Sequence, residues 1–145
     1  KNGLMAVEAV IFFDPKYAWE FELRRKRGAH LFSKHRYLAA QMQAYLDDDL
    51  WLDLAQKANQ SCAKLVKGLK ENSEVQLDFE PAANMVFAHW TRASHQRLHA
   101  AGAQYYVLDG DYTTGDKNEM LAARLVTDWS ISDQNINKFL DILSS

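Results

Sequence analysis

One long amphipathic pattern limits how this chain can fold more than any other feature. From residue 50 onward, apolar side chains recur at three- and four-residue spacing for about six helical turns, at Leu50, Leu54, Ala58, Cys62, Leu65 and Leu69. This spacing places them on one face of an α-helix, and such a face must be covered by other elements. Three aspartates, at positions 47–49, precede the pattern, where the helix dipole favours negative charge. We therefore predict a long helix that packs along one side.

Shorter segments follow this helix, and their order indicates a small α/β domain. Strand-like runs cover residues 75–79, 84–90, 104–108 and 121–129, and helical runs cover residues 91–101 and the stretch from Ser132 onward. The resulting order of strand, strand, helix, strand, strand, helix is typical of a compact layer of helices on a sheet.

The stretch MAVEAVIFF, residues 5–13, is nearly continuously apolar and is closed by Asp14 and Pro15. A short run of this kind is typical of a strand that is buried on both faces. Because such a strand needs cover on each side, we expect it to belong to a larger sheet that lies mostly outside this sequence.

Residues 16–46 carry two helical patches, which Gly28 separates. The first contains Tyr17, Trp19, Phe21 and Leu23 and runs into the basic stretch RRKR. The second is expected to begin at the capping residue Ser33, and it repeats apolar residues on one face at Leu38, Met42, Tyr45 and Leu46.

Charge and composition exclude some classes of partner. The 145 residues carry a net charge of −2, and the isoelectric point is about 6.2. Proteins that bind nucleic acids or membrane surfaces usually have a basic excess, so we expect neither partner. No apolar run approaches the roughly 20 residues that span a bilayer. The single cysteine, Cys62, cannot form an internal disulfide and suits a reducing compartment, which favours the cytoplasm.

The basic residues 24–27, followed by Lys34, form the strongest local concentration of charge. One interpretation is a solvated helix end, whose cations complement the helix dipole. The other is a phosphate site, because Gly28 and Ala29 allow close approach of the backbone while arginine and lysine side chains supply donors.

Arg124 lies inside the apolar run LAARLVTDW, where a guanidinium without a partner would cost several kcal/mol. It therefore needs an anion. An ion pair with Glu8 or Asp128 is one possibility, and an arginine on an edge strand that reaches water is another. The functional interpretation is bidentate capture of a substrate carboxylate, which the planar guanidinium does better than lysine.

Metal chemistry is poorly supported by the sequence. His95 and His99 share a helix face, but Gln96 stands where a metalloprotease helix requires glutamate. The loop DGDYTTGDKNEM lacks the final glutamate of a calcium loop, because Met120 occupies that place. We expect a polar hairpin loop there, core packing for Cys62, and no metal site.

Four segments in order, KNGLMAVEAVIFFDP, ELRRKRGAHLFSKHRYLAAQM, AYLDDDLWLDLAQKAN and ARLVTDWSIS, resemble the threonine aldolase family of the beta-eliminating lyase superfamily. The resemblance covers essentially the whole chain and implies the C-terminal half of an α/β, aspartate-aminotransferase-like fold. Residues 1–48 would then be the last strand of the large domain with its connecting helices. Residues 49–145 would be a long interdomain helix and the small α/β domain.

The resemblance also implies roles for individual residues. Lys1 matches the lysine that carries pyridoxal 5′-phosphate covalently, and Arg124 matches the arginine that binds the carboxylate of the amino acid. Lys34 and Arg27 lie in the segment that reaches the cofactor phosphate of a neighbouring subunit. The residues of the family that stack on the cofactor ring all precede the lysine and are not in this sequence.

The implied function is cleavage of threonine, or a related β-hydroxy-α-amino acid, to glycine and an aldehyde. The implied partners are an amino-acid substrate, the N-terminal half of the same enzyme, and further copies in a homodimer or homotetramer with shared active sites. Two alternatives stay open: another enzyme that uses this cofactor, such as a beta-eliminating lyase, transaminase or racemase, and a non-catalytic α/β interaction module.

Overall fold

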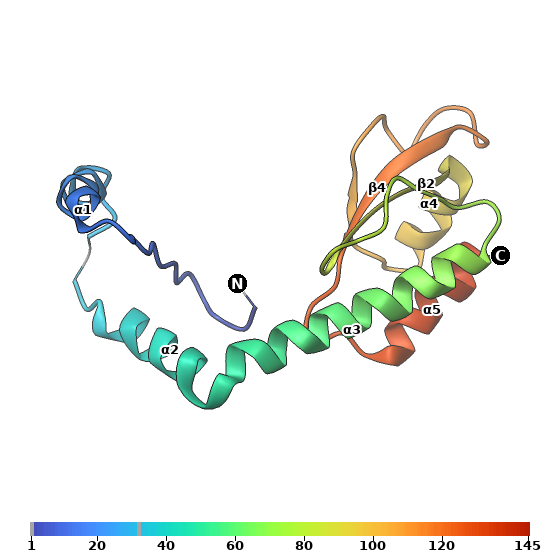
Figure 1. Ribbon diagram of the computed structural model, residues 1–145. Helices are drawn as coiled ribbons and strands as arrows, with labels where there is room; N and C mark the ends of the chain where they lie inside the picture. The colour runs from blue at the N-terminus through green and yellow to red at the C-terminus, as the bar shows by residue number, and fades with distance from the viewer. Residues whose placement is uncertain (1, 32) are drawn as a thin grey trace. The chain divides into compact units, whose positions relative to one another are not determined.

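The computed structural model describes residues 2–31 and 33–145 (Figure 1). The chain forms two compact units, Lys1–Leu52 and Asp53–Ser145. Each unit is described by itself. The sequence placed the boundary between residues 48 and 49, and the assignment of the two parts to a large and a small domain stays a prediction. No helix among the described residues is both long and apolar enough to cross a membrane.

The first unit contains two short helices and two single turns. These are η1 (Pro15–Tyr17), α1 (Ala18–Arg27), α2 (Arg36–Leu46) and η2 (Asp47–Asp49). Asp14 caps η1, since its carboxylate accepts a 3.0 Å hydrogen bond from the backbone N–H of Lys16. The helix α1 ends at Gly28, whose N–H donates to the carbonyl of Arg24 at 2.8 Å. The two helical patches predicted for this region are therefore confirmed.

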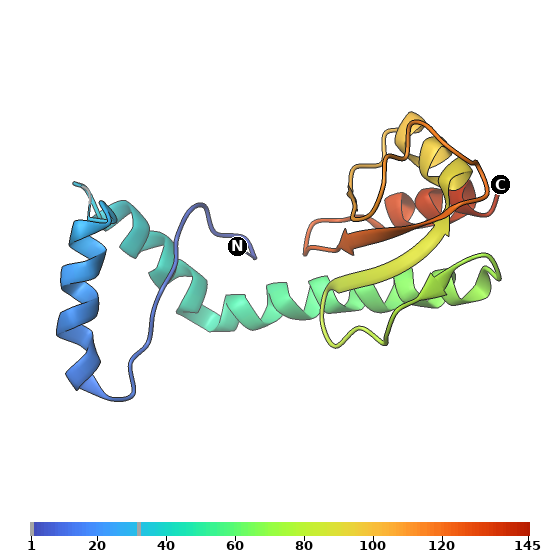
Figure 2. The same ribbon diagram turned by 90° about the horizontal axis from the view of Figure 1, so that it is seen from above.

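The strand predicted for residues 5–13 is wrong in this structure, which describes all of these residues. They form an irregular coil that runs towards α1 (Figure 2). Val7 alone among them is buried, whereas Ile11 is 78% exposed and Phe13 is 99% exposed. A strand exists only where a neighbour satisfies its backbone N–H and C=O groups, and the described part of the first unit provides no such neighbour. A continuous run of apolar residues is therefore not sufficient to form a strand.

The predicted cap at Ser33 is also wrong. The helix α2 begins at Arg36, with His35 in the N-cap position and no side-chain capping bond. Lys34, just before it, has a φ of 67°, which is the left-handed conformation that disfavours helical continuation.

The long helix is confirmed as α3 (Leu50–Glu71). Its buried residues follow the predicted spacing and are Leu54, Ala58, Cys62, Leu65, Val66 and Leu69. Leu50 itself is exposed at the start of the helix. Cys62 is 2% exposed and belongs to the core, as predicted.

A four-stranded antiparallel sheet forms the centre of the second unit. Its strands are β1 (Gln76–Leu77), β2 (Met85–Thr91), β3 (Tyr106–Val107) and β4 (Met120–Val126), in the order β1-β2-β4-β3. Two helices complete the unit, α4 (Arg92–Ala100) and α5 (Asp133–Leu143). The order of elements predicted from the sequence is confirmed.

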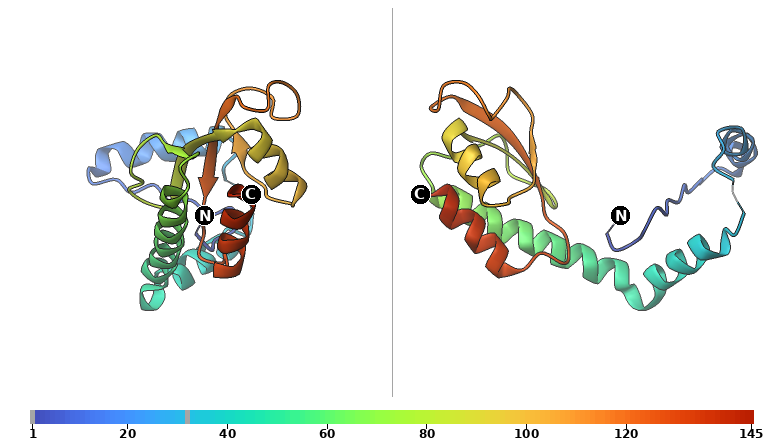
Figure 3. Two further views of the ribbon diagram at one scale, coloured as in Figure 1. Left: turned by 90° about the vertical axis from the view of Figure 1, so that its right-hand side faces the viewer. Right: turned by 180° about the vertical axis from the view of Figure 1, so that it is seen from behind.

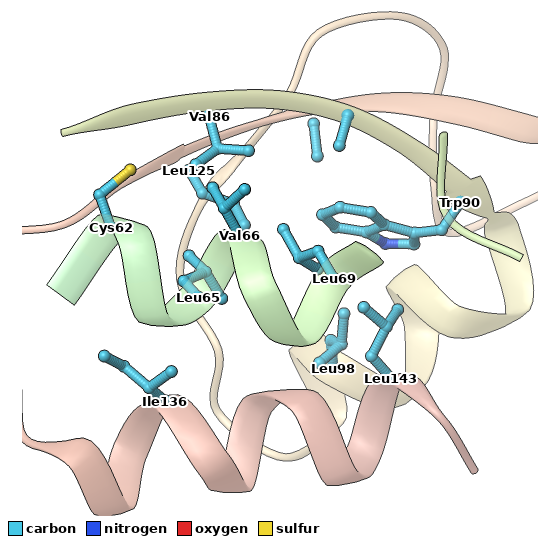
Figure 4. Packing of buried hydrophobic residues seen from close by; sticks show 12 residues of the cluster. Cys62, Leu65, Val66, Leu69, Val86, Trp90, Leu98, Leu125, Ile136 and Leu143 are labelled. Carbon is cyan, nitrogen blue, oxygen red and sulfur yellow. The ribbon is translucent and has the colours of Figure 1, made fainter. Parts of the chain in front are cut away.

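The helices α3, α4 and α5 cover one face of this sheet (Figure 3). Val86 and Trp90 of β2 and Leu125 of β4 point towards the helices and form the core with Leu65, Val66, Leu69, Leu98, Ile136 and Leu143 (Figure 4). Because side chains alternate along a strand, Met85, Phe87 and His89 of β2 and Ala122, Arg124 and Val126 of β4 point to the opposite face, called here the open face.

Candidate functional site

Arg124 stands on the open face, in the middle of an inner strand. In the register of the sheet it lies directly opposite Phe87 of β2 on one side and Tyr106 of β3 on the other. The end of its strand is fixed by Thr127, whose hydroxyl donates a 2.9 Å hydrogen bond to the carbonyl of Ala58 in α3. The position of Arg124 is thus set by the sheet and by the long helix.

The guanidinium of Arg124 has no carboxylate partner among the described residues of the second unit. Its Nε atom is buried and makes no hydrogen bond. Asp128, one of the partners considered from the sequence, instead accepts hydrogen bonds from the backbone N–H groups of Ser130 and Ile131 at 2.8 and 2.9 Å. The edge-strand interpretation is wrong, because β4 lies between β2 and β3.

Tyr106 is the group that does contact the guanidinium. The Cζ atom of Arg124 lies 4.5 Å from the centroid of the Tyr106 ring, which is a cation–π distance. Tyr106 is not among the site residues predicted from the sequence. The sequence does indicate a strand at Tyr105 and Tyr106. It does not indicate the register between β3 and β4, which places Tyr106 opposite Arg124.

His89 is a second polar group on the open face, and it is not among the site residues predicted from the sequence. Its Nδ1 atom lies 2.9 Å from Oδ1 of Asp78, and its register partner is Ala122, two residues before Arg124 on the same face. A carboxylate in this position orients the imidazole ring. The open face therefore carries one guanidinium without an anion and one histidine with an acidic partner.

Part of the basic cluster in the first unit is neutralised locally. Arg24 pairs with Glu20 at 2.8 Å and Arg25 pairs with Glu22 at 2.6 Å. The hydrogen bond from Arg25 is the main reason that the pKa of the Glu22 carboxyl lies below its usual value. No salt bridge joins Arg27 or Lys34 to an acid in the described part of this unit. Lys26 likewise has no salt bridge there, so Lys26, Arg27 and Lys34 are the predicted basic residues that remain as candidates for an anion site.

The backbone near these cations contains two residues with positive φ. Gly28 has an ordinary φ of −77°, whereas Ala29 and Lys34 adopt the left-handed region at 60° and 67°. Left-handed conformations are uncommon for residues with a Cβ atom, and they mark the connection between α1 and α2 as strained.

The predicted catalytic residue, Lys1, lies outside the described residues, but the residue after it is well anchored. The side-chain amide of Asn2 donates to the Tyr45 hydroxyl at 2.7 Å and to the carbonyl of Trp51 at 3.3 Å. The backbone N–H of Met5 donates to Gln41 at 2.9 Å. The turn at Asn2 and Gly3 is therefore held against α2 and the start of α3.

The two histidines of α4 serve the core of the second unit. The Nδ1 atom of His95 lies 2.8 Å from the hydroxyl of Tyr105, and its Nε2 atom lies 3.1 Å from the carbonyl oxygen of Leu121. His99 stacks on Tyr105 and Tyr112 at centroid distances of 4.5 and 4.2 Å. Burial lowers the pKa of both histidines. The predicted polar hairpin loop is confirmed between β3 and β4.

The sequence of this chain is similar to those of known proteins. The chain is 35% identical over 111 residues to a low specificity L-threonine aldolase from Pseudomonas aeruginosa, a match that covers 77% of this chain and 32% of that protein. It is 36% identical over 111 residues to the protein of the same description from another Pseudomonas strain, with 76% and 32% coverage. The chain is homologous to threonine aldolases.

The chain spans about a third of the length of these threonine aldolases. No protein-family model matches it. Among solved structures, a threonine aldolase from Leishmania major matches with a TM-score of 0.65 and 22% identity, over 76% of this chain and 30% of that one. A serine palmitoyltransferase from Sphingomonas wittichii matches with a TM-score of 0.51 and 19% identity, over 63% and 24%. These likenesses confirm the predicted fold class, an α/β part of an aspartate-aminotransferase-like fold.

The open face and the basic cluster suit different anions. Arg124 presents a fixed guanidinium from a rigid strand, which suits a planar carboxylate. Arg27 and Lys34 are exposed cations on a strained connection, and they suit a phosphate group of higher charge.

Proposed function

We propose that the complete protein is an aldolase that uses pyridoxal 5′-phosphate to cleave threonine, or a related β-hydroxy-α-amino acid, to glycine and an aldehyde. The observation that carries this proposal is Arg124, a strand arginine with a buried Nε that has no partner, in a chain homologous to threonine aldolases. A guanidinium that is left without an acid inside a sheet is costly unless a ligand supplies the anion.

The residues of this chain have the chemical groups that the cofactor requires. Lys1 supplies a primary amine that can carry the cofactor covalently. Arg27 and Lys34 have no salt bridge in the described part of the first unit, so their donors are available to the phosphate. Arg124 remains available to the substrate rather than to the cofactor.

In the proposed reaction Arg124 binds the α-carboxylate of the amino acid through two parallel hydrogen bonds. This contact sets the orientation of the substrate, and the orientation decides which bond at the α-carbon breaks. When bound, the cofactor withdraws the electron pair that is left on the α-carbon. A base removes the proton of the β-hydroxyl, the bond between the α- and β-carbons breaks, and protonation of the α-carbon completes glycine. We assign the base to no histidine of this chain.

We further infer that the first unit is covered by other protein in the complete enzyme, either by the rest of the polypeptide or by another copy in a homodimer or homotetramer. Phe13, Ile11 and Trp19 are 99%, 78% and 70% exposed, and exposed apolar side chains in such a concentration mark interaction surfaces. If active sites are shared, mixing Lys34→Ala subunits with Lys1→Ala subunits should recover part of the activity. Additive losses without recovery would contradict shared sites.

The cofactor assignment is tested by the visible absorbance of the complete protein after addition of pyridoxal phosphate. We expect a band from the lysine-bound cofactor that Lys1→Ala abolishes, and that the control Lys57→Ala, on an exposed surface of α3, retains. An unchanged band in Lys1→Ala would show that Lys1 does not carry the cofactor.

A further inference from the structure

We propose that Tyr106 is a positioning residue for the substrate site: its ring holds the Arg124 guanidinium in the orientation that receives the amino-acid carboxylate. This inference rests on the proposed function, because it takes Arg124 as the carboxylate-binding residue. It concerns a residue that does not itself bind substrate.

The geometry that carries the inference lies within the second unit. Tyr106 and Arg124 are direct cross-strand neighbours in the antiparallel pair of β3 and β4. The Cζ atom of Arg124 lies 4.5 Å from the ring centroid, so the guanidinium lies over the ring. Direct cross-strand neighbours share a face and have their Cβ atoms within about 5.5 Å, which makes this contact a consequence of the register.

The nature of the contact explains why it would serve a binding site. All five N–H donors of a guanidinium lie in its plane, and an aromatic ring attracts the cation through its face. A carboxylate from the protein would instead use these donors and block a ligand. Tyr106 therefore steadies the side chain of Arg124 while it leaves the donors for an incoming carboxylate.

The other neighbour of Arg124 does not take this role. Phe87 lies opposite Arg124 in β2, but its ring packs on Phe79 at a centroid distance of 5.5 Å. The guanidinium of Arg124 consequently has an aromatic contact on the β3 side. The preceding tyrosine, Tyr105, is also committed elsewhere, since its hydroxyl lies against His95 in the core.

Tyr106 does not contribute to the core of the second unit, so positioning Arg124 does not conflict with a packing role. Its side chain is 66% exposed, it is absent from the core, and no hydrogen bond to its hydroxyl is found in the described part of the chain. The hydroxyl is therefore dispensable, and the ring is the functional part. Variants that remove only the hydroxyl can therefore be compared with variants that remove the ring.

The test is steady-state kinetics of the complete enzyme with L-threonine. Tyr106→Ala and Tyr106→Leu should each raise KM about three- to tenfold, the range of a cation–π contact between exposed and partly desolvated sites, with kcat nearly unchanged. Tyr106→Phe should keep the wild-type KM, because it retains the ring. Gln134→Ala changes an exposed side chain of α5 in the second unit, away from the open face, and it should leave both constants unchanged.

The variant Arg124→Ala distinguishes the positioning role of Tyr106 from the carboxylate-binding role of Arg124. If Arg124→Ala raises KM and adding Tyr106→Ala then changes nothing more, the ring acts through the guanidinium as proposed. If Arg124→Ala raises KM but neither Tyr106→Ala nor Tyr106→Leu does, the positioning role is overturned and the proposed function stands. If Arg124→Ala leaves KM unchanged, the carboxylate assignment itself fails, and with it the role of Tyr106.

Discussion

The side-chain amide of Asn2 donates a 2.7 Å hydrogen bond to the hydroxyl of Tyr45, a residue of α2 that lies 43 positions further along the chain. This bond ties the residue that follows Lys1 to a helix. A lysine that must reach a fixed atom of a cofactor benefits from such a tether, because rate falls steeply when a reacting group is misplaced.

Tyr45→Phe removes the acceptor of this bond and should weaken the attachment of the cofactor. A neutral hydrogen bond contributes about 1 kcal/mol, so we expect roughly a fivefold loss in affinity for pyridoxal phosphate. This affinity is measured by adding pyridoxal phosphate in steps and recording the absorbance of the bound cofactor. Tyr37→Phe alters an exposed tyrosine of the same helix and should leave the affinity unchanged; equal affinities in both variants would show that the tether is irrelevant.

Arg124→Ala should raise KM for L-threonine by tenfold or more, because truncating one partner of a buried, hydrogen-bonded charge pair costs about 2 to 5 kcal/mol. Arg124→Lys should give a smaller rise, since lysine keeps the charge but not the planar pair of donors. Initial rates over a range of substrate concentrations decide the matter. A near-normal KM in Arg124→Ala would return this arginine to a structural role.

Gly68→Ala should destabilise the second unit, although alanine favours helices more than glycine does. A Cβ atom at Gly68 would clash with the side chain of Leu140, so this side chain would have to leave its packed position between α3 and α5. Overpacking of this kind costs about 1 to 3 kcal/mol. Urea unfolding measures the change, and Leu140→Ala in the Gly68→Ala background should restore part of it. A gain in stability from Gly68→Ala alone would contradict the packing described for this pair.

The stability of the second unit should fall as the pH is lowered below about 6.5, the usual pKa of histidine. The carbonyl of Leu121 can only accept, so Nε2 of His95 donates to it, and Nδ1 accepts from the Tyr105 hydroxyl. Burial lowers the pKa of His95 in the folded state, so the unfolded chain binds its proton first. Stability is then complete above the unfolded pKa and is lost as the pH falls towards the folded pKa.

Thermal or urea unfolding between pH 7.5 and 5 measures this slope, and His95→Gln should flatten it. A slope that is unchanged in His95→Gln would mean that other groups, such as His99, whose pKa is also lowered, produce all of the dependence.

The parts of the fold that the sequence predicted well are those with a local cause. The spacing of Leu54, Cys62 and Leu69 defines a helix face without reference to any other segment, and α3 follows it. Thr91 and Ser132 cap α4 and α5 through their own side chains. Such features are readable because the interacting groups are a few residues apart.

The parts that were missed depend on distant neighbours. Residues 5–13 have the apolar character of a buried strand, but a strand also requires a partner for its backbone. Tyr106 meets Arg124 only because of the register between β3 and β4, which a shift of one residue would abolish. The need of Arg124 for an anion was predictable from its apolar surroundings, whereas the ring that contacts it was not.

The most direct test of the central claim is the identity of the products that the complete protein, loaded with pyridoxal phosphate, makes from L-threonine and from L-allo-threonine. The account predicts glycine and acetaldehyde in equal amounts from at least one of the two. Formation of an α-keto acid without acetaldehyde would contradict it and would indicate a transaminase or a beta-eliminating lyase instead.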